Sequence, residues 1–136
     1  MESKKDTSCR KWMITINNPL DKGFTHEKIK EVLSSIRSLD YWAMCDEIGN
    51  EKHTLHTHIV IHRGGQLRFS TLQKKFPPGS QLDMLRGTLQ QARDYIRKEG
   101  KYKGTAKEET NLKNTFEESG IVPEEHQVKR NDLVDL

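Results

Sequence analysis

The order of strand-like and helix-like segments predicts an α+β domain built on an antiparallel sheet. Apolar residues at alternate positions indicate strands, and apolar residues at i, i+3, i+4 and i+7 indicate helices. These patterns follow one another as β-α-β-β-α-β-α. Residues 47 and 56 are too close in sequence for a parallel crossover, so the second and third strands should form a hairpin. We expect an antiparallel sheet of about five strands with helices packed mainly on one face.

Four strands are predicted from runs of β-branched and aromatic residues that end at turn-forming residues. The first strand should end at Pro19, because proline has no N–H to donate to a neighbouring strand. Gly49-Asn50 is a turn signal between the second and third strands. The four predicted strands span residues 11–19, 41–47, 55–63 and 81–85. The segments Thr115-Phe116 and Gly120-Ile-Val-Pro123 could add an edge strand or dock on the domain.

Three helices are predicted between these strands. Residues 25–37 carry a stripe of four apolar residues, and Thr25 can cap the first turn. A short helix over residues 69–76 should stop at Pro77-Pro78-Gly79. Thr88-Leu-Gln-Gln91 has the form of a capping box, so a helix should run from residue 88 to about residue 98 and end at Gly100. The apolar stripes are Ile29, Val32, Leu33 and Ile36 in the first helix and Leu89, Ala92 and Ile96 in the last.

Length and charge indicate one basic domain with a tail. The chain has 136 residues, of which 32% are hydrophobic, so part of it is expected to lie outside the core. We expect a flexible N-terminus over residues 1–10, a domain over 11–103 and an acidic C-terminal segment over 104–136. That segment carries four Lys or Arg and eight Asp or Glu, so residues 1–103 carry 19 and 12 and a net charge of +7. This charge favours a polyanionic partner such as nucleic acid.

Cysteine usage and hydropathy predict an intracellular protein without a membrane partner. Cys9 and Cys45 show no paired spacing, which favours a reducing compartment. No apolar stretch approaches the length of a signal sequence or a membrane span.

The strand from Leu55 to His62 contains two histidines that should share one face. Because strand side chains alternate between faces, His56 and His58 should lie about 6 to 7 Å apart, opposite Thr57 and its apolar neighbours. The hairpin should return a carboxylate to them from Asp46-Glu47. Either carboxylate is possible, and the spacing to His56 favours Glu47. Two imidazoles and one carboxylate suit a divalent cation that also holds a substrate oxygen.

The last predicted helix supplies a second chemical group. Tyr95 lies on the shoulder of the apolar stripe, and Lys98 follows three residues later on the same side. A tyrosine in this position is most often a packing residue with its hydroxyl in water. Beside a metal ion, however, a phenol can attack a phosphodiester, and a lysine can offset the negative charge that develops.

Three motifs in this order resemble those of a known family. They are Ile14-Thr-Ile-Asn-Asn-Pro19, His56-Thr-His58 and Tyr95-Ile-Arg-Lys98 followed by Glu99-Gly100. Together they are similar to the motifs of the HUH rolling-circle replication initiators (Rep proteins) of small circular single-stranded DNA viruses, such as circoviruses, and of related plasmids. The resemblance covers about residues 11–102. It implies the HUH endonuclease fold with an RRM-like or ferredoxin-like sheet.

The family resemblance also implies a reaction. The expected enzyme nicks single-stranded origin DNA in a stem-loop, becomes joined through tyrosine to the 5′ phosphate, leaves a 3′ hydroxyl and later reverses the transfer. The implied cofactor is Mn²⁺ or Mg²⁺. The implied location is the nucleus of a eukaryotic host or the cytoplasm of a bacterium. Residues 104–136 resemble a linker towards a helicase domain, although the chain contains no phosphate-loop motif, and any oligomer is expected only in the full-length protein.

The resemblance assigns a role to each motif residue. Tyr95 matches the nucleophile and Lys98 the motif lysine. The metal ligands are expected to be Glu47, His56 and His58, and the residues linked to origin DNA are expected to be Thr15, Asn17 and Asn18.

Two other functions are compatible with parts of the pattern. A non-catalytic nucleic-acid-binding module with an RRM-like sheet would need exposed aromatic residues on its central strands. An Fe(II) oxygenase could use the same two-histidine, one-carboxylate set, but it would leave Tyr95, Lys98 and the basic charge unexplained.

Overall fold

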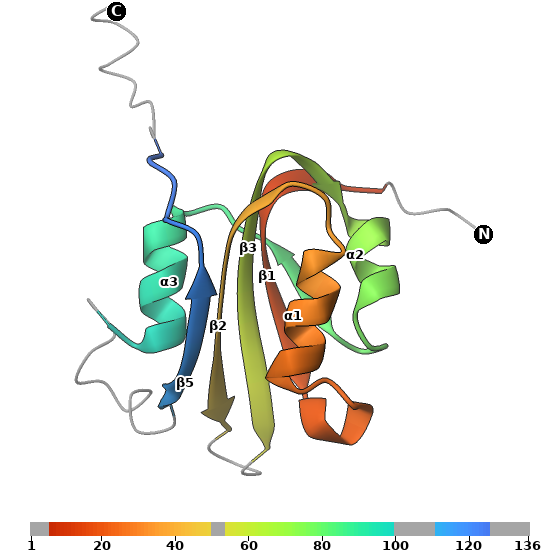
Figure 1. The fold of residues 1–136 in the computed structure, drawn as a ribbon, viewed down its shortest axis with the longest axis vertical. Coiled ribbons are helices and arrows are strands. Elements are labelled where there is room, and N and C mark those ends of the chain that lie inside the picture. The colour runs from red at the N-terminus through yellow and green to blue at the C-terminus, as the bar shows by residue number, and fades with distance from the viewer. Residues whose placement is uncertain (1–5, 50–53, 100–110, 126–136) are drawn as a thin grey trace, which may run out of the picture.

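The computed structural model describes residues 6–49, 54–99 and 111–125, and these form an α+β domain (Figure 1). Its five strands form one antiparallel sheet in the order β4-β1-β3-β2-β5. The predicted fold class is therefore confirmed. The strands are β1 (Ser8–Asn17), β2 (Leu39–Ile48), β3 (Leu55–Arg68), β4 (Gln81–Met84) and β5 (Asn111–Ser119).

Three α-helices cover both faces of this sheet, whereas we expected them mainly on one face. Their bounds are α1 (His26–Ser34), α2 (Phe69–Lys75) and α3 (Leu89–Arg97), and a 3₁₀ turn spans Pro19–Lys22. Helices α1 and α2 lie on one side of the sheet and α3 on the other (Figure 1). The sheet is apolar on its second face too, because Ala43, Cys45 and Val60 point that way and require a cover. None of the described helices has the length and apolar character needed to cross a membrane.

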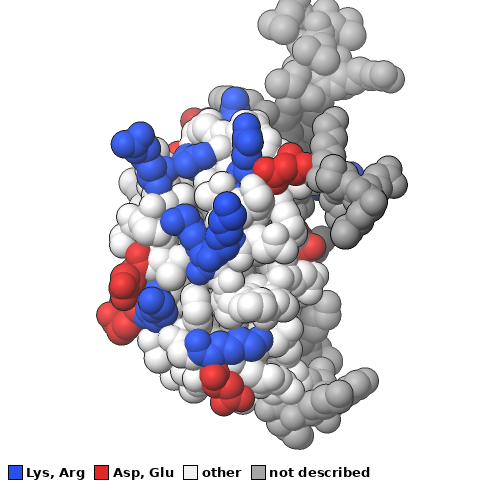
Figure 2. Space-filling model, turned by 90° about the vertical axis from the view of Figure 1, so that its right-hand side faces the viewer, with Lys and Arg blue, Asp and Glu red and all other residues white. Residues whose placement is uncertain are grey.

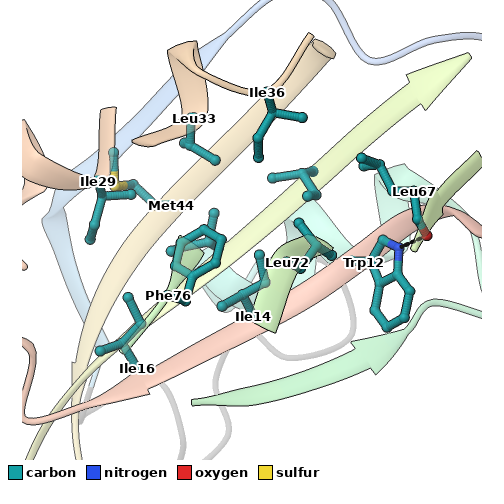
Figure 3. Packing of buried hydrophobic residues seen from close by; sticks show 12 residues of the cluster. Trp12, Ile14, Ile16, Ile29, Leu33, Ile36, Met44, Leu67, Leu72 and Phe76 are labelled. Atoms are coloured by element: carbon teal, nitrogen blue, oxygen red, sulfur yellow. Dashed lines mark hydrogen bonds between the residues drawn. The ribbon is translucent and has the colours of Figure 1, made fainter. Parts of the chain in front are cut away.

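The larger core lies between the sheet and the pair α1 and α2. Alternate residues of β1 and β3, including Ile14 and Ile59, are fully buried against Ile29 of α1 and Leu72 of α2. Figure 3 shows these side chains converging from the strands and both helices. The indole Nε1 of Trp12 donates a hydrogen bond to the Leu67 carbonyl at 3.1 Å, which satisfies the one polar atom of that buried ring.

The predicted N-terminal caps of the first and last helices are confirmed, whereas α3 ends at Arg97 with Lys98 as its left-handed cap, and the predicted cap Gly100 lies outside the described residues. The Thr25 hydroxyl accepts from the Lys28 amide at 3.2 Å and begins α1. Thr88 and Gln91 form a complete capping box, in which each side chain accepts a hydrogen bond from the other residue's amide. Helix α1 ends at Ser34, before the predicted residue 37.

The folded unit extends beyond both predicted boundaries. Strand β1 begins at Ser8, and Asp6 accepts hydrogen bonds from Ser70, so residues before 11 belong to the domain. Strand β5 pairs antiparallel with β2 along the sheet edge, although we assigned residues 104–136 to a linker. Residues 1–5, 100–110 and 126–136, which include parts of the predicted N-terminus and linker, lie outside the described residues.

Candidate active site

Strand β3 places His56 and His58 on the face of the sheet that α3 covers. Their ring centroids are 6.4 Å apart and the rings are nearly parallel. On one side β1 aligns Asn17 with His56 and Thr15 with His58, and on the other side β2 aligns Glu47 with His56. The two-residue period of the strands thus brings residues from three strands together. The sequence indicated the return of Glu47 to the histidines, whereas the position of β1 beside β3 depends on the sheet order.

Both histidines are held through the ring nitrogen Nδ1. The amide oxygen of Asn17 accepts a hydrogen bond from His56 Nδ1, and the Thr15 hydroxyl lies 3.1 Å from His58 Nδ1. Since the Asn17 oxygen cannot donate, His56 carries a proton on Nδ1, and a metal ion could bind this ring only through Nε2. Supporting partners of this kind orient imidazoles that bind metal ions.

The three residues that we expected to bind origin DNA do not all lie at the cavity. Thr15 and Asn17 line the same cavity as the histidines, whereas Asn18 is not among the lining residues. Asn18 precedes the 3₁₀ turn in a left-handed conformation, and its amide donates to the Leu55 carbonyl at 2.8 Å.

The structure distinguishes the two candidate carboxylates. Asp46 faces the opposite side of the sheet, where it accepts hydrogen bonds from Thr57 at 2.7 Å and from His26 at 2.8 Å. Glu47 faces the histidines, and its Oε1 lies 3.9 Å from His58 Nε2. Of the pair Asp46-Glu47, only Glu47 reaches the cavity.

Lys98 is fully buried beneath the cavity, although a lysine at the end of a helix is normally solvated. It caps α3 in a left-handed conformation with φ 54°. Its Nζ lies 2.9 Å from Glu47 Oε1 and 3.7 Å from the centroid of the Tyr95 ring. Neither Nζ nor Oε1 forms a hydrogen bond with good geometry among the described residues, so the contact is an ion pair.

Tyr95 completes the cavity from α3. Its half-buried ring meets the His58 ring edge-on, with 6.0 Å between the centroids. The capping box at Thr88 fixes where α3 begins, and Ala92 and Ile96 fix which face it presents to the sheet. Tyr95 is therefore directed at the histidine strand by the packing of its own helix.

The cavity has a volume of about 340 Å³, and its wall includes three residues that we did not predict, Met13, Gln81 and Asp83. Gln81 and Asp83 belong to β4, where they align with Thr15 and Met13 of β1. Their alternation in the sequence marks a shared face, but the position of β4 beside β1 depends on the sheet order. The cavity is lined by Met13, Thr15, Asn17, Glu47, His56, His58, Gln81, Asp83 and Tyr95.

The electrostatics of the cavity keep His58 neutral. Burial lowers the pKa of His58 to about 4, with Glu47 opposing the shift and Lys98 and His56 adding to it. His58 is therefore an uncharged imidazole at neutral pH. Neutral imidazole is the form that binds metal ions.

The residues present fit a divalent cation, although their side chains do not yet converge as a ligand set. Within the described residues, no three His, Cys, Asp or Glu side chains stand close enough to form a metal cluster. Both Nδ1 atoms are engaged by supporting partners, so Nε2 is the atom of each ring that could bind a cation, and a Cβ at Gly49 would come within 3.0 Å of His56 Nε2. The absence of a side chain there leaves space beside the imidazole.

Two further histidines, His53 and His62, flank the His56 and His58 pair in the sequence. His62 is bonded to Asp40 through Nδ1 and does not line the cavity. His53 lies outside the described residues.

Fold and cavity together define an antiparallel α+β domain in which imidazole, carboxylate and phenol groups line one cavity and the Lys98 ammonium is buried beside Glu47 and Tyr95. A comparison with known proteins finds similarity to the replication-associated protein of Beak and feather disease virus, with 31% identity over 100 residues. The match covers 74% of this chain and 32% of that protein, so the chain spans about a third of that relative's length. No protein-family model matches the chain. The similarity supports a relationship to replication-associated proteins in general.

Proposed function

We propose that this domain is a replication-initiator endonuclease that nicks single-stranded DNA and becomes joined to the 5′ phosphate through Tyr95. The observation that carries the proposal is the placement of Tyr95 on the wall of the cavity that the histidine pair and Glu47 also line, with Lys98 buried against Glu47 and the Tyr95 ring. These groups come from three separate elements, and none of them is needed to fill the larger core.

The proposed step is a phosphoryl transfer in which one bond to phosphorus forms and another breaks. The Tyr95 oxygen forms a bond to phosphorus, and the bond between phosphorus and the 3′ oxygen breaks. The phenol proton passes to solvent, and the departing 3′ oxygen takes up a proton to become a hydroxyl. Strand transfer is the reverse reaction, with an incoming 3′ hydroxyl displacing Tyr95.

Lys98 and the histidines have distinct tasks in this proposal. The Lys98 ammonium lies 3.7 Å from the centroid of the Tyr95 ring, where its positive charge can offset the negative charge that develops during the attack. Glu47, His56 and His58 would hold Mn²⁺ or Mg²⁺, and a bound cation would polarise the phosphate oxygen. Thr15 and Asn17 engage Nδ1 of the two imidazoles and orient the rings, so that Nε2 would be the atom that binds the cation.

A covalent-adduct assay tests the proposal. Wild-type protein is incubated with labelled single-stranded hairpin oligonucleotides and Mn²⁺, and adducts are resolved under denaturing conditions. Tyr95→Phe keeps the ring and removes the attacking oxygen, so we expect DNA binding to persist and the adduct to vanish. The matched control is Tyr41→Phe, because the buried Tyr41 hydroxyl bonds Glu118 at 2.8 Å, away from the cavity.

Peptide mapping then identifies the attached residue. A nucleotide on the Tyr95 peptide supports the mechanism. Attachment at Tyr102, which lies outside the described residues, would move the nucleophile. Cleavage without any adduct would replace covalent catalysis by attack of water.

The alternative of a non-catalytic RRM-like module receives less support. Such a module stacks bases on aromatic residues of its central strands. On β1 and β3, the only aromatic side chain other than histidine is Trp12, which is buried on the opposite face. Helix α3 also covers the face on which the histidines lie.

A further inference from the structure

The end of helix α3 is tied to the edge strand β5 by the side chain of Asn111. The amide Nδ2 of Asn111 donates a hydrogen bond to the Ile96 carbonyl at 2.7 Å. A carbonyl oxygen can only accept, so this contact identifies the nitrogen of the Asn111 amide. Asn111 lies in the segment that we assigned to a linker, and none of the three sequence motifs contains it.

The Ile96 carbonyl belongs to the last turn of α3, where carbonyl groups have no partner within the helix. The Tyr95 carbonyl accepts from the Lys98 amide at 3.1 Å. The Asp94 carbonyl accepts from the Glu99 amide at 2.8 Å. The partner of the Ile96 carbonyl comes instead from β5. The end of α3 is therefore held both by its own backbone and by the neighbouring strand.

Lys98 is the residue whose backbone these hydrogen bonds hold. Its φ of 54° lies in the left-handed region, which lysine rarely adopts and which persists where the surrounding structure enforces it. Lys98 is also fully buried, and its ammonium lies 2.9 Å from the Glu47 carboxylate. A shift of the helix end would therefore move this ammonium relative to Glu47 and the Tyr95 ring.

The strand position of Asn111 lies directly opposite Glu47. Strands β2 and β5 are antiparallel, and their register aligns Asn111 with Glu47. Opposed residues of such a pair share one face of the sheet, so Asn111 lies on the face that α3 covers. Its Nδ2 also lies 3.7 Å from the buried thiol of Cys45 in β2. One side chain thus connects the strand pair at Glu47 to the helix end that carries Lys98.

We propose that Asn111 is a positioning residue for nicking, which holds the Lys98 ammonium between Glu47 and the Tyr95 ring. The inference rests on the proposed function. Asn111 is not among the residues that line the cavity, so it acts through Lys98 and not on the DNA itself. Loss of the link should slow the chemical step and leave DNA affinity unchanged, because a misplacement of about 1 Å can cost about a hundredfold in rate.

Asn111→Leu is the test variant, because leucine has nearly the same shape and no N–H to donate. Thr115→Val is the matched control on the same strand, where Thr115 is half-buried like Asn111. The Thr115 hydroxyl accepts from the Asp46 amide at 2.8 Å and donates to the Leu112 carbonyl at 2.6 Å. The control therefore removes hydrogen bonds from β5 without touching the link to α3.

The first measurement is the single-turnover rate of adduct formation with a saturating hairpin oligonucleotide and Mn²⁺, together with DNA affinity. We expect Asn111→Leu to lower the rate by about tenfold or more and to change the affinity by less than about twofold. Thr115→Val should change either quantity by less than about twofold. An unchanged rate in Asn111→Leu, or an equal loss in Thr115→Val, overturns the positioning role.

A double-mutant cycle with Lys98→Met distinguishes positioning from a general loss of structure. If Asn111 acts through Lys98, adding Asn111→Leu to Lys98→Met should slow adduct formation by less than about twofold, because the positioned group is already gone. The full loss of about tenfold in that background overturns the inference.

Hydrogen exchange of backbone amides tests the link without any reaction and without Lys98→Met. The amides of Lys98 and Glu99 should exchange at least about fivefold faster in Asn111→Leu than in the wild type, and at the wild-type rate in Thr115→Val. Unchanged exchange in Asn111→Leu overturns the inference. A wild type that forms no adduct overturns the proposed function and the role of Asn111 with it. Adduct formation at the same rate in the wild type and Asn111→Leu overturns the positioning role alone.

Discussion

The two faces of the sheet are built from different side chains. On the α1 and α2 face, strand residues such as Ile14 and Ile59 meet helix residues in a continuous apolar core (Figure 3). On the α3 face, a smaller apolar cluster around Val60 stops at the histidines. Beyond it lie the fully buried Lys98 and the partly buried Glu47. One face therefore stabilises the domain, and the other carries groups that cost stability and can perform chemistry.

The largest contrast is expected between two neighbouring residues of β3. Ile59→Ala removes a fully buried side chain from the larger core and should lower the free energy of unfolding by about 2 to 5 kcal/mol. His58→Ala removes a side chain at a cavity wall and should cost about 1 kcal/mol or less. Its Mn²⁺-dependent adduct formation should nevertheless be abolished, and the same holds for His56→Ala. Urea unfolding and single-turnover adduct assays measure the two effects.

Folded Ile59→Ala should remain active below its unfolding transition. If His56→Ala and His58→Ala both nick DNA at the wild-type rate, the histidines are not part of the catalytic site.

A smaller but more specific effect is expected at the buried ion pair. Lys98→Met should lower the free energy of unfolding by about 3 kcal/mol, because Glu47 is left without its cation. Glu47→Gln combined with Lys98→Met removes both charges and should recover part of that loss. Chemical denaturation of the two single variants and the double variant gives the coupling free energy. A coupling near zero would show that Glu47 turns to solvent when Lys98 is removed.

The sheet and the histidine face could be predicted because both follow from local periodicity. The two-residue period places His56 and His58 together, and the short hairpin returns Glu47 to His56. The caps at Thr25 and Thr88 are likewise local signals, and both are confirmed. For these features, the information lies within about ten residues of sequence.

The features that the sequence analysis missed or, like the edge strand at Thr115-Phe116, left open depend on contacts between distant segments. Strand β5 lies at an edge and is only partly buried, so its sequence lacks a clear apolar alternation. Gln81 and Asp83 reach the cavity because β4 pairs with β1. The burial of Lys98 follows from the left-handed cap of α3 and the position of Glu47, which periodicity does not encode.

Stability as a function of pH should separate the two faces through their histidines. The pKa of His58 is lowered to about 4 by burial, so the unfolded chain binds more protons there between pH 4 and 6.5. His58 therefore makes stability rise with pH across that window, by roughly 3 kcal/mol at most. On the other face, hydrogen bonding to Asp46 raises the pKa of His26, with a further contribution from Glu117 and burial opposing. Its stabilising contribution is complete below pH 6.5 and is lost as pH rises through the folded-state pKa.

Thermal unfolding in EDTA across this pH range provides the measurement. His58→Gln should flatten the acid side of the stability curve, and His26→Gln should flatten the alkaline side. If one variant flattened both sides, the two histidines would not titrate independently.

The smallest effect on DNA binding and nicking is expected when charged residues are replaced on the exposed surface of α1 and α2. Figure 2 shows Lys and Arg side chains spread over this side of the molecule, with few Asp or Glu among them. Lys74 and Lys75 of α2 belong to the face opposite the cavity. The double variant Lys74→Gln, Lys75→Gln should therefore change the nicking rate by less than about twofold. The slope of log affinity for single-stranded DNA against log salt concentration should change by less than about one, the value expected for the loss of one phosphate contact. A tenfold loss of affinity in a binding titration would instead mean that the DNA strand also contacts the α1 and α2 face.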